Sequence, residues 1–520
     1  MRRRTLLAGS AALLTACTRE APALQGGWVG ASFERGHRLR EGKARPSPAV
    51  QRRAQVLVVG GGVAGLAAAR GFVQRGVQDV HVLELEDESG GNSRSHTLGG
   101  MACPLGAHYL PLPGPHAHEL SDWLHEIGLL RQHFGRTVAD ERHLCHSPQE
   151  RLFIDGAWVE GLLPPTAPGS ALHAQYQRLA ARIKTLQTGV GGKPSFAIPT
   201  HRAAFSPELV ALDAQTFEAW LQAEGLIDPK LLWYLDYCCR DDYGAGIATV
   251  SAWAGIHYFA SRHGFHAPGD EEAERGAVFT WPEGNAWLVQ HLLAGLSERV
   301  HSARTVFQVS ELKHGVQVLT FDERTQQVEA WLADTVVVAV PLHVAARVLA
   351  SPPQALLDAA RHTQQAPWLV ANMLLDAPLL ERSGAPPSWD NVIYGSAALG
   401  YVDAMHQSLR AAPGATVLTS YHALPMAERA GLLMTTWRDA AQRVLQELLP
   451  THPDLPRRLQ HIALARWGHA MAIPVPGQRS LASRAALRAM RGRLRFAHSD
   501  VAGYSTFEEA FTLGHEAALR

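Results

Sequence analysis

Charge, cysteine and long apolar runs are all scarce in this chain of 520 residues. Basic and acidic side chains number 48 each, so the net charge is zero and only 18% of the residues are charged. A protein that neutralises many phosphates has a basic excess or basic blocks, so nucleic acid is excluded as the main partner. The five cysteines show neither CxxC nor Cys/His spacing, which excludes a disulfide scaffold and a zinc ribbon. No window beyond residue 17 has eighteen consecutive apolar residues, so we expect no membrane-spanning helix.

The first residues have the features of an export signal. Three arginines at positions 2–4 precede a short apolar stretch, and Arg3-Arg4-Thr5-Leu6-Leu7 resembles a twin-arginine signal. Leu14-Thr15-Ala16-Cys17 resembles a bacterial lipobox, in which the cysteine is lipidated. We therefore expect a signal peptide over 1–17 and a periplasmic protein held to the membrane by lipid on Cys17 alone; the alternative is a basic amphipathic tail. Residues 18–49 lack periodicity and predict a tether.

A strand–loop–helix–strand unit is predicted directly after this tether. Residues 55–59 form a continuous apolar run, as a buried parallel strand requires, and residues 80–83 predict the second strand. Between them lies Gly60-Gly61-Gly62-Val63-Ala64-Gly65, followed by a helical stretch. The second strand ends on Glu84. This arrangement predicts a dinucleotide site.

Each part of this fingerprint has a physical role. Gly60 permits a tight turn, Gly62 lets the backbone approach a pyrophosphate, and Gly65 allows the helix to pack closely on the strand. The helix that starts at Val63 and Ala64 offers free N–H groups and a partial positive charge to the phosphates. Glu84 can accept hydrogen bonds from a ribose.

The segment after Glu84 resembles a second flavin signature. Gly90-Gly91-Asn92-Ser93-Arg94-Ser95 is similar to the GGRxxS/T segment of the flavin-containing amine oxidase family, a group of glutathione-reductase-like flavoproteins. The resemblance implies that Gly90 and Gly91 bring the backbone beside the FAD diphosphate. Asn92 stands where the family usually has arginine, so Arg94 is the remaining cation for the diphosphate.

Three further segments resemble this family. Pro104-Leu105-Gly106-Ala107-His108-Tyr109 is similar to the DxGAxW segment, which implies that Gly106 and Ala107 pass near the isoalloxazine ring; Pro104 replaces the usual acid. Ser302-Ala303-Arg304-Thr305-Val306 resembles the segment whose backbone meets the adenine, with Val306 as the candidate. In the C-terminal segment, Asp500 matches the acid beside the ribityl–phosphate region, and Ser505 and Thr506 open a helix that faces the flavin's pyrimidine edge.

The resemblance spans nearly the whole chain and implies an α/β fold, in which a discontinuous Rossmann-like FAD domain is interleaved with an α+β substrate domain. The FAD domain is assigned to 50–113, 270–345 and 485–520, and the substrate domain to 114–269 and 346–484. Within the FAD domain, alternation at 316–319 and around Val328 predicts a small hairpin meander. No cysteine follows Cys239, so the FAD is expected to be non-covalent.

The substrate site is less well defined by the sequence. By resemblance, Trp467 lies on the substrate-facing strand, and with Tyr504 it is a candidate for an aromatic cage that orients an amine; ordinary core packing is the alternative. His108 is expected near the flavin, with a structural hydrogen-bonding role as the alternative. Many family members hold a water with a lysine, but none of the five lysines lies in a matching motif. The His116-Ala117-His118 pattern lacks a third ligand, so no metal is assigned.

Three functions remain open. The first is an exported amine or amino-acid oxidase or dehydrogenase that transfers a hydride from a C–N bond to flavin N5. The second is a desaturase or protoporphyrinogen-oxidase-like enzyme acting on an apolar substrate, because the FAD signatures are shared. The third is a non-catalytic flavoprotein that serves in electron transfer or assembly. The electron acceptor of an enzyme exported in this way would be oxygen, a quinone or a periplasmic carrier.

Overall fold

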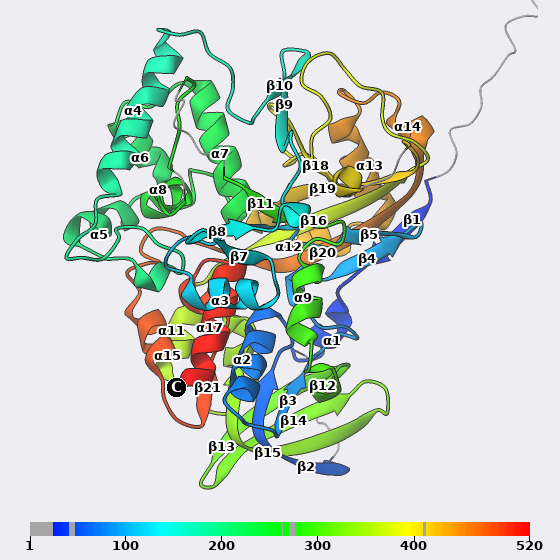
Figure 1. The fold of residues 1–520 in the computed structure, drawn as a ribbon. Helices are drawn as coiled ribbons and strands as arrows, with labels where there is room; N and C mark the ends of the chain where they lie inside the picture. The colour runs from blue at the N-terminus through cyan, green and yellow to red at the C-terminus, as the bar shows by residue number, and fades with distance from the viewer. Residues whose placement is uncertain (1–23, 41–46, 263, 270–275, 409–411) are drawn as a thin grey trace, which may run out of the picture.

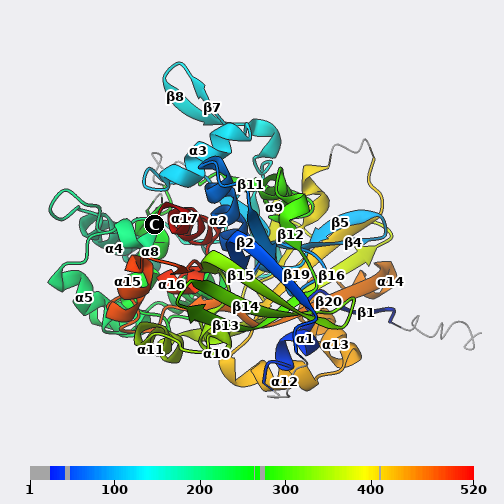
Figure 2. The ribbon, with the colours of Figure 1, turned by 90° about the horizontal axis from the view of Figure 1, so that it is seen from below.

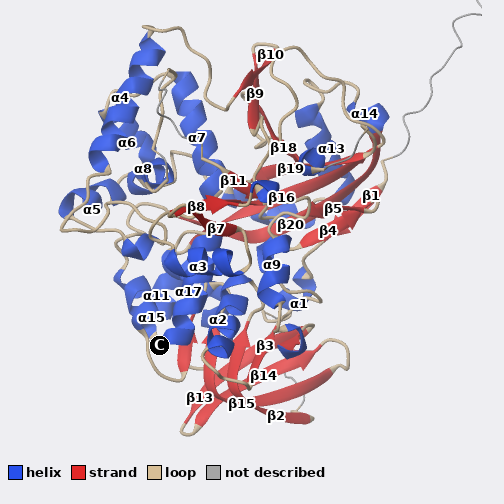
Figure 3. Ribbon diagram, in the orientation of Figure 1, coloured by secondary structure: helices blue, strands red, loops and turns tan. Residues whose placement is uncertain are grey.

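The computed structural model describes residues 24–40, 47–262, 264–269, 276–408 and 412–520. The expected signal peptide and Cys17 lie outside these residues. Two large sheets organise the described chain, one at the lower end of the view and the other across its middle, with helices between and around them (Figures 1 and 3). No described helix is both long enough and apolar enough to cross a bilayer.

The first sheet contains the predicted dinucleotide unit. Its strand order is β12-β3-β2-β15-β14-β13, and β21 pairs with β15. The strands are β2 (Val50–Val59), β3 (Val80–Leu83), β12 (Val300–His301), β13 (Arg304–Leu312), β14 (Gly315–Asp322), β15 (Gln327–Val338) and β21 (Leu494–Phe496). The pairs β2–β3, β2–β15 and β15–β21 are parallel, and β13, β14 and β15 form the antiparallel meander. Leu57 and Val58 are fully buried, as expected for a strand covered on both faces.

Two helices pack together on this sheet. Helix α2 (Val63–Gln74) follows the glycine loop, and the C-terminal helix α17 (Phe507–Leu519) lies beside it (Figures 1 and 2). Their contact depends on Gly514, because a Cβ there would lie 2.1 Å from the carbonyl oxygen of Ala64. The last helix of the chain is thereby fixed against the helix that begins at the glycine loop.

The second sheet has eight strands in the order β1-β20-β16-β19-β18-β17-β9-β10. These are β1 (Gly26–Val29), β20 (Leu459–Ile473), β16 (Gln364–Leu375), β19 (Thr416–Ala423), β18 (Tyr401–Asp403), β17 (Asp390–Ile393), β9 (Glu150–Ile154) and β10 (Ala157–Glu160). A helical group lies at one side of this sheet: α4 (Ala171–Leu186), α5 (Pro207–Asp213), α6 (Phe217–Ala223), α7 (Pro229–Tyr243) and α8 (Ala252–Ala260) (Figure 3). Helix α13 (Trp437–Leu448) packs on β16 and β20 through a separate apolar cluster.

The remaining elements are short and connect or cover the sheets. The helices are α1 (Phe33–His37), α3 (His118–Glu126), α9 (Ala286–Leu293), α10 (Leu342–Val348), α11 (Gln354–His362), α12 (Arg429–Met434), α14 (Leu455–Arg458), α15 (Ala482–Ala489) and α16 (Ser499–Ala502). The strands are β4 (Ser95–Leu98), β5 (Met101–Pro104), β6 (Tyr109–Pro111), β7 (Leu130–His133), β8 (Arg136–Ala139) and β11 (Val278–Thr280).

The prediction of an irregular tether over 18–49 is wrong for residues 24–40. Strand β1 pairs in parallel with β20, and α1 follows it. Gly26 makes the close approach possible, because a Cβ there would lie 1.9 Å from the carbonyl oxygen of Ile462. The Ser32 N–H also donates to the Glu86 carboxylate at 2.9 Å. Apart from β1, every strand of the two large sheets comes from the segments assigned to the corresponding domain, although the domain boundaries stay predictions.

Candidate active site

The glycine loop 60–65 is shaped by contacts that exclude side chains. Gly60 has φ +106°, and a Cβ there would lie 2.5 Å from the carbonyl oxygen of Ala339. At Gly65, a Cβ would lie 1.9 Å from the carbonyl oxygen of Gly60. Helix α2 begins after Gly62, which provides no side-chain cap, so the first N–H groups of the helix are available to an anion.

The carboxylate of Glu84 is hydrogen-bonded to this glycine loop. Its Oε2 accepts a hydrogen bond from the Gly61 N–H at 2.7 Å, and its Oε1 accepts one from the Glu86 N–H at 2.8 Å. Burial raises the pKa of Glu84, while the two N–H groups and the Arg94 guanidinium act in the opposite direction. Each carboxylate oxygen keeps a further lone pair, as a ribose hydroxyl requires.

A second glycine pair closes the loop from the other side. Gly62 and Gly90 form a parallel bridge, and a Cβ at Gly62 would have only the Cα of Gly91 nearby, at 3.9 Å. The buried hydroxyl of Ser89 beside this loop has no hydrogen-bond partner among the described residues. Two side-chain-free turns, a helix N-terminus and an orphaned donor therefore fit the diphosphate of FAD.

The other residues assigned to the cofactor are also buried, and their roles stay predictions. Arg94 donates from Nε to the carbonyl of Gly91 at 3.2 Å, and its guanidinium lies 5.4 Å from the centre of the Trp467 ring. Val306 is buried in β13. The Asp500 carboxylate accepts from the Leu342 N–H at 3.1 Å and from Gln365 Nε2 at 2.8 Å. His498, the Leu342 N–H and Arg484 together hold the pKa of Asp500 well below its usual range despite burial.

A cavity of about 150 Å³ lies where the Gly106–Ala107 segment, β20 and the start of α17 meet. Its lining includes Gly106, Ala107, His108, Trp467, Ser505 and Thr506. Thr506 is the N-cap of α17 and accepts from the Glu509 N–H, whereas Ser505 accepts from the Ala472 N–H at 2.8 Å. The structure thus brings together most of the residues that the sequence placed around the reactive part of the flavin.

Trp467 and His108 both line this cavity. Trp467 Nε1 donates to the carbonyl oxygen of Leu105 at 2.7 Å, which fixes the indole beside the Gly106 segment. His108 stacks on Tyr421, with ring centres 4.2 Å apart. Burial lowers the pKa of His108 to about 3, so the imidazole is neutral at physiological pH and is a poor proton acceptor.

The expected pairing of Tyr504 with Trp467 in one aromatic cage is not what the structure shows. Tyr504 is 1% exposed, lines neither cavity, and packs against Trp253 at 5.7 Å between ring centres. Gly503, in the left-handed region with φ +87°, ends α16 and directs Tyr504 into the core. Trp368 and Tyr421, on neighbouring strands, line the smaller cavity instead.

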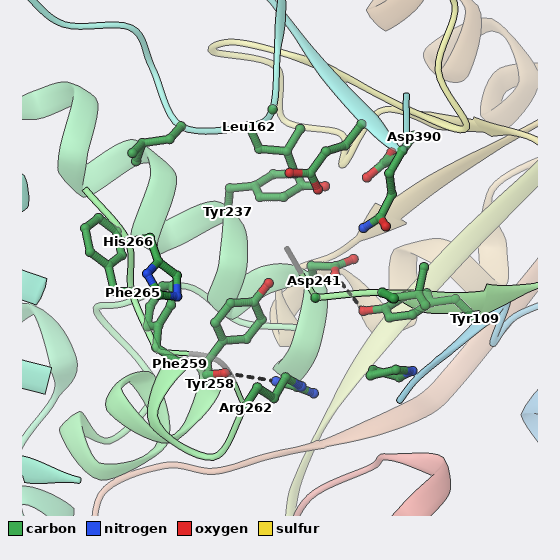
Figure 4. A pocket seen from close by; sticks show the side chains of 18 of the residues that line it. Tyr109, Leu162, Tyr237, Asp241, Tyr258, Phe259, Arg262, Phe265, His266 and Asp390 are labelled. Atoms are coloured by element: carbon green, nitrogen blue, oxygen red, sulfur yellow. Dashed lines mark hydrogen bonds between the residues drawn. The ribbon is translucent and has the colours of Figure 1, made fainter. Parts of the chain in front are cut away.

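A larger cavity of about 970 Å³ adjoins the smaller one (Figure 4). His108, Tyr109, Asp241, Arg262, Tyr421 and Glu508 line both. Aromatic rings form much of the wall of the larger cavity, among them Tyr234, Tyr237, Tyr258, Phe259, Phe265 and Trp389. Five carboxylates also line it: Glu150, Glu160, Asp241, Asp390 and Glu508.

The charges around this larger cavity are strongly unbalanced. Arg262 is the one arginine or lysine among its described lining residues, and it already forms an ion pair with Asp242 at 3.3 Å. Burial and repulsion from Asp242 raise the pKa of Asp241 to about 7. Burial, Asp241 and Glu150 together raise the pKa of Asp390 well above its usual range. Such raised values indicate carboxylates gathered without a matching cation.

Local sequence patterns indicate only some of the acidic residues of the larger cavity. Asp241 and Asp242 are adjacent at the end of an aromatic stretch that forms α7, which was a visible signal. Asp390 is on β17, and Glu150 is on the neighbouring strand β9; the parallel β17–β9 pairing brings them opposite one another. No local pattern predicts that pairing. None of Lys184, Lys193, Lys230 and Lys313, the lysines in the described part of the chain, lines either cavity.

The dinucleotide loop, the closing helix and the two cavities define a flavin-dependent oxidoreductase. The chain belongs to the flavin-containing amine oxidoreductase family, whose model matches residues 63–520. The family resemblance, the fold class and the FAD cofactor expected from the sequence are confirmed. Non-covalent attachment of the FAD stays a prediction.

Solved structures share the fold at low identity. Putrescine oxidase bound to putrescine is 17% identical, with a TM-score of 0.64 over 90% of this chain and 99% of that chain. Cyclohexylamine oxidase from Brevibacterium oxydans is 16% identical, with a TM-score of 0.65 over 90% of this chain and 98% of that chain. The protein anon-37Cs of Drosophila melanogaster is 35% identical over 66 residues, and this stretch spans only 13% of that relative's length.

Proposed function

We propose that the protein oxidises the C–N bond of a cationic amine that carries a second positive group, as a diamine or polyamine does. The observation that carries this proposal is the pair Asp241 and Asp390 in the wall of the larger cavity: both have raised pKa values, and the one arginine among the described lining residues is already paired. A buried carboxylate is costly unless a cation pairs with it, so the cavity favours a ligand with more than one positive charge.

The same charges argue against the other substrate classes. An amino acid brings a carboxylate, and recognition of a carboxylate calls for a free arginine or lysine; Arg262 is held by Asp242 and by the carbonyl oxygen of Tyr258. An apolar substrate would leave Asp241 and Asp390 desolvated without compensation. Amines therefore fit this site better than amino acids, porphyrinogens or isoprenoids.

The protein's own residues bind and orient the amine. Bound FAD supplies the acceptor for the hydride. Tyr109, Trp368, Tyr421 and Trp467 provide aromatic faces that attract an ammonium group and exclude water from the smaller cavity. The carboxylates of the larger cavity hold the distal cation. Putrescine oxidase, which shares the fold, is bound to the diamine putrescine, and this supports the assignment.

An anaerobic substrate screen tests the proposal. Bleaching of the bound flavin should be fast with diamines and polyamines, slower with monoamines of equal length, and absent with amino acids. Matched pairs that differ only in a terminal amine or methyl group isolate the contribution of the second charge. Bleaching only by lipophilic compounds would support the desaturase alternative, and a flavin that no small molecule bleaches would support a non-catalytic role.

We further propose that the protein is a periplasmic lipoprotein exported by the twin-arginine route, on the N-terminal pattern that ends at Cys17. The Cys17→Ser variant is expected to move from the membrane fraction to the soluble fraction, because no acyl chain is attached. The Cys145→Ser variant is the matched control, since this half-buried free thiol lies in the folded chain. Persistent pelleting of the Cys17→Ser protein after a salt wash would contradict lipid anchoring.

A further inference from the structure

Asp241 is one of the residues that line both cavities. It is near the C-terminus of α7, lines both the smaller and the larger cavity, and its Oδ2 accepts a hydrogen bond from the Tyr109 hydroxyl at 3.3 Å (Figure 4). Tyr109 is held by β6, the strand that continues directly from the Gly106–Ala107 segment. Asp241 is therefore connected to the wall on which the reactive part of the flavin is expected.

Asn285, a buried polar residue in the lining of the smaller cavity, has one atom without a hydrogen-bond partner among the described residues. Asn285 is 2% exposed, and its Nδ2 donates to the carbonyl oxygen of Tyr109 at 2.9 Å. Its Oδ1 accepts no hydrogen bond from the described residues. An unsatisfied buried acceptor in a cavity that a carboxylate also lines suits a ligand that donates through N–H groups, as an ammonium does.

On the basis of the function proposed above, we propose that Asp241 is the catalytic proton acceptor that converts the bound ammonium substrate into the neutral amine. One N–H bond of the ammonium breaks, one O–H bond forms on the Asp241 carboxylate, and no electrons are transferred in this step. The neutral nitrogen then has the lone pair that the forming C=N bond requires. Asp241 returns its proton to water between turnovers.

The other candidate bases are less suitable for this role. His108 is stacked on Tyr421 and is neutral, with its pKa lowered to about 3. Asp242 is committed to Arg262. Glu508 also lies in the field of Arg262. The pKa of Asp241, raised to about 7 mainly by burial, suits an acceptor that works near neutral pH.

Charged and titratable groups from several elements face Asp241. They are Tyr237, Cys238, Arg240 and Asp242 on α7, Tyr109 on β6, Tyr258 and Arg262 on and after α8, Asp390 on β17, and Tyr421 on β19. Arg240 and Arg262 lower the pKa of Asp241, and Asp242 raises it.

The pH dependence of anaerobic flavin reduction by a diamine tests the assignment. In the wild type, the second-order rate constant for flavin reduction at low diamine concentration should rise with pH and level off above an apparent pKa of about 7, where Asp241 of the free protein is charged. In Asp241→Asn, this inflection should vanish and the rate near pH 6 should fall about 100-fold. The rate should recover as the pH approaches the pKa of the free amine, about 10, because the substrate then binds neutral.

Two matched variants separate proton transfer from simple charge. Asp241→Glu keeps a carboxylate and should keep the inflection. Asp390→Asn removes a carboxyl group from the larger cavity only. It should weaken diamine binding and keep the inflection near its wild-type position, because Asp242 is the carboxylate that raises the pKa of Asp241. Circular dichroism and flavin content confirm that each variant is folded and loaded.

Two results would overturn the inference while leaving the proposed function intact. One is an Asp241→Asn variant whose pH profile of flavin reduction is the same as that of the wild type. The other is an equal loss of rate at every pH, which would assign Asp241 to binding alone. If no amine bleaches the wild-type flavin at any pH, the proposed function itself is contradicted.

Discussion

The Glu84→Ala variant is expected to lose FAD during purification, with an affinity about 100-fold below that of the wild type. The Glu84 carboxylate accepts hydrogen bonds from the Gly61 N–H of the glycine loop and from the Glu86 N–H just after its own strand. Alanine removes the acceptor for a ribose hydroxyl and leaves the Gly61 N–H without its buried partner. Two charge-assisted hydrogen bonds together stabilise by about 3 kcal/mol.

The measurement is the ratio of flavin absorbance to protein in the purified variant, followed by fluorescence titration of the apoprotein with FAD. Glu88→Ala is the matched control, since Glu88 lies four residues away, is exposed, and should leave the flavin content unchanged. A Glu84→Ala protein that retains full yellow colour would show that the carboxylate does not hold the cofactor.

The Asp390→Asn variant is expected to bind a diamine about 30-fold more weakly than the wild type, because one of the buried charges that face the distal ammonium is gone. Monoamine binding should change much less. Dissociation constants from anaerobic reduction, measured for a diamine and a monoamine of equal length, provide the comparison. Equal losses for the two substrates would show that Asp390 does not recognise the second charge.

The same substitution is expected to stabilise the ligand-free protein at alkaline pH. The pKa of Asp390 is raised by burial and by Asp241 and Glu150, whereas in the unfolded chain it returns to its ordinary value. Between these two pKa values the unfolded state binds fewer protons than the folded state. The contribution of Asp390 to the free energy of unfolding therefore falls as the pH rises. The melting temperature of the variant should exceed that of the wild type at about pH 8, and the difference should vanish near pH 4. A difference independent of pH would contradict the electrostatic cause.

The sequence predicted the elements whose signals are local. The apolar run before Gly60, the glycine spacing and the strand ending at Glu84 lie within one short segment, and β2, α2 and β3 form there as expected. The alternation around Val316 and Val328 likewise became β14 and β15. Strand β2 pairs with β3, and β14 pairs with β15, so these strands also have partners nearby in the sequence.

The features that the sequence did not predict depend on contacts between distant segments. Strand β1 exists because it pairs with β20, more than four hundred residues away, through a close approach at Gly26. Asp390 comes close enough to Asp241 for the two carboxylates to interact electrostatically only because β17 joins the second sheet. Tyr504 follows a motif that suggests the flavin, yet the turn at Gly503 sends its ring into the core. Composition and periodicity carry no information on such pairings.

The flavin content of the purified protein tests the central claim most directly. If the loop 60–65 and the start of α17 bind FAD, the protein should be yellow, contain one FAD per chain, and release intact FAD when it is denatured. A protein that stays colourless after refolding with excess free FAD would contradict the claim that this chain binds FAD.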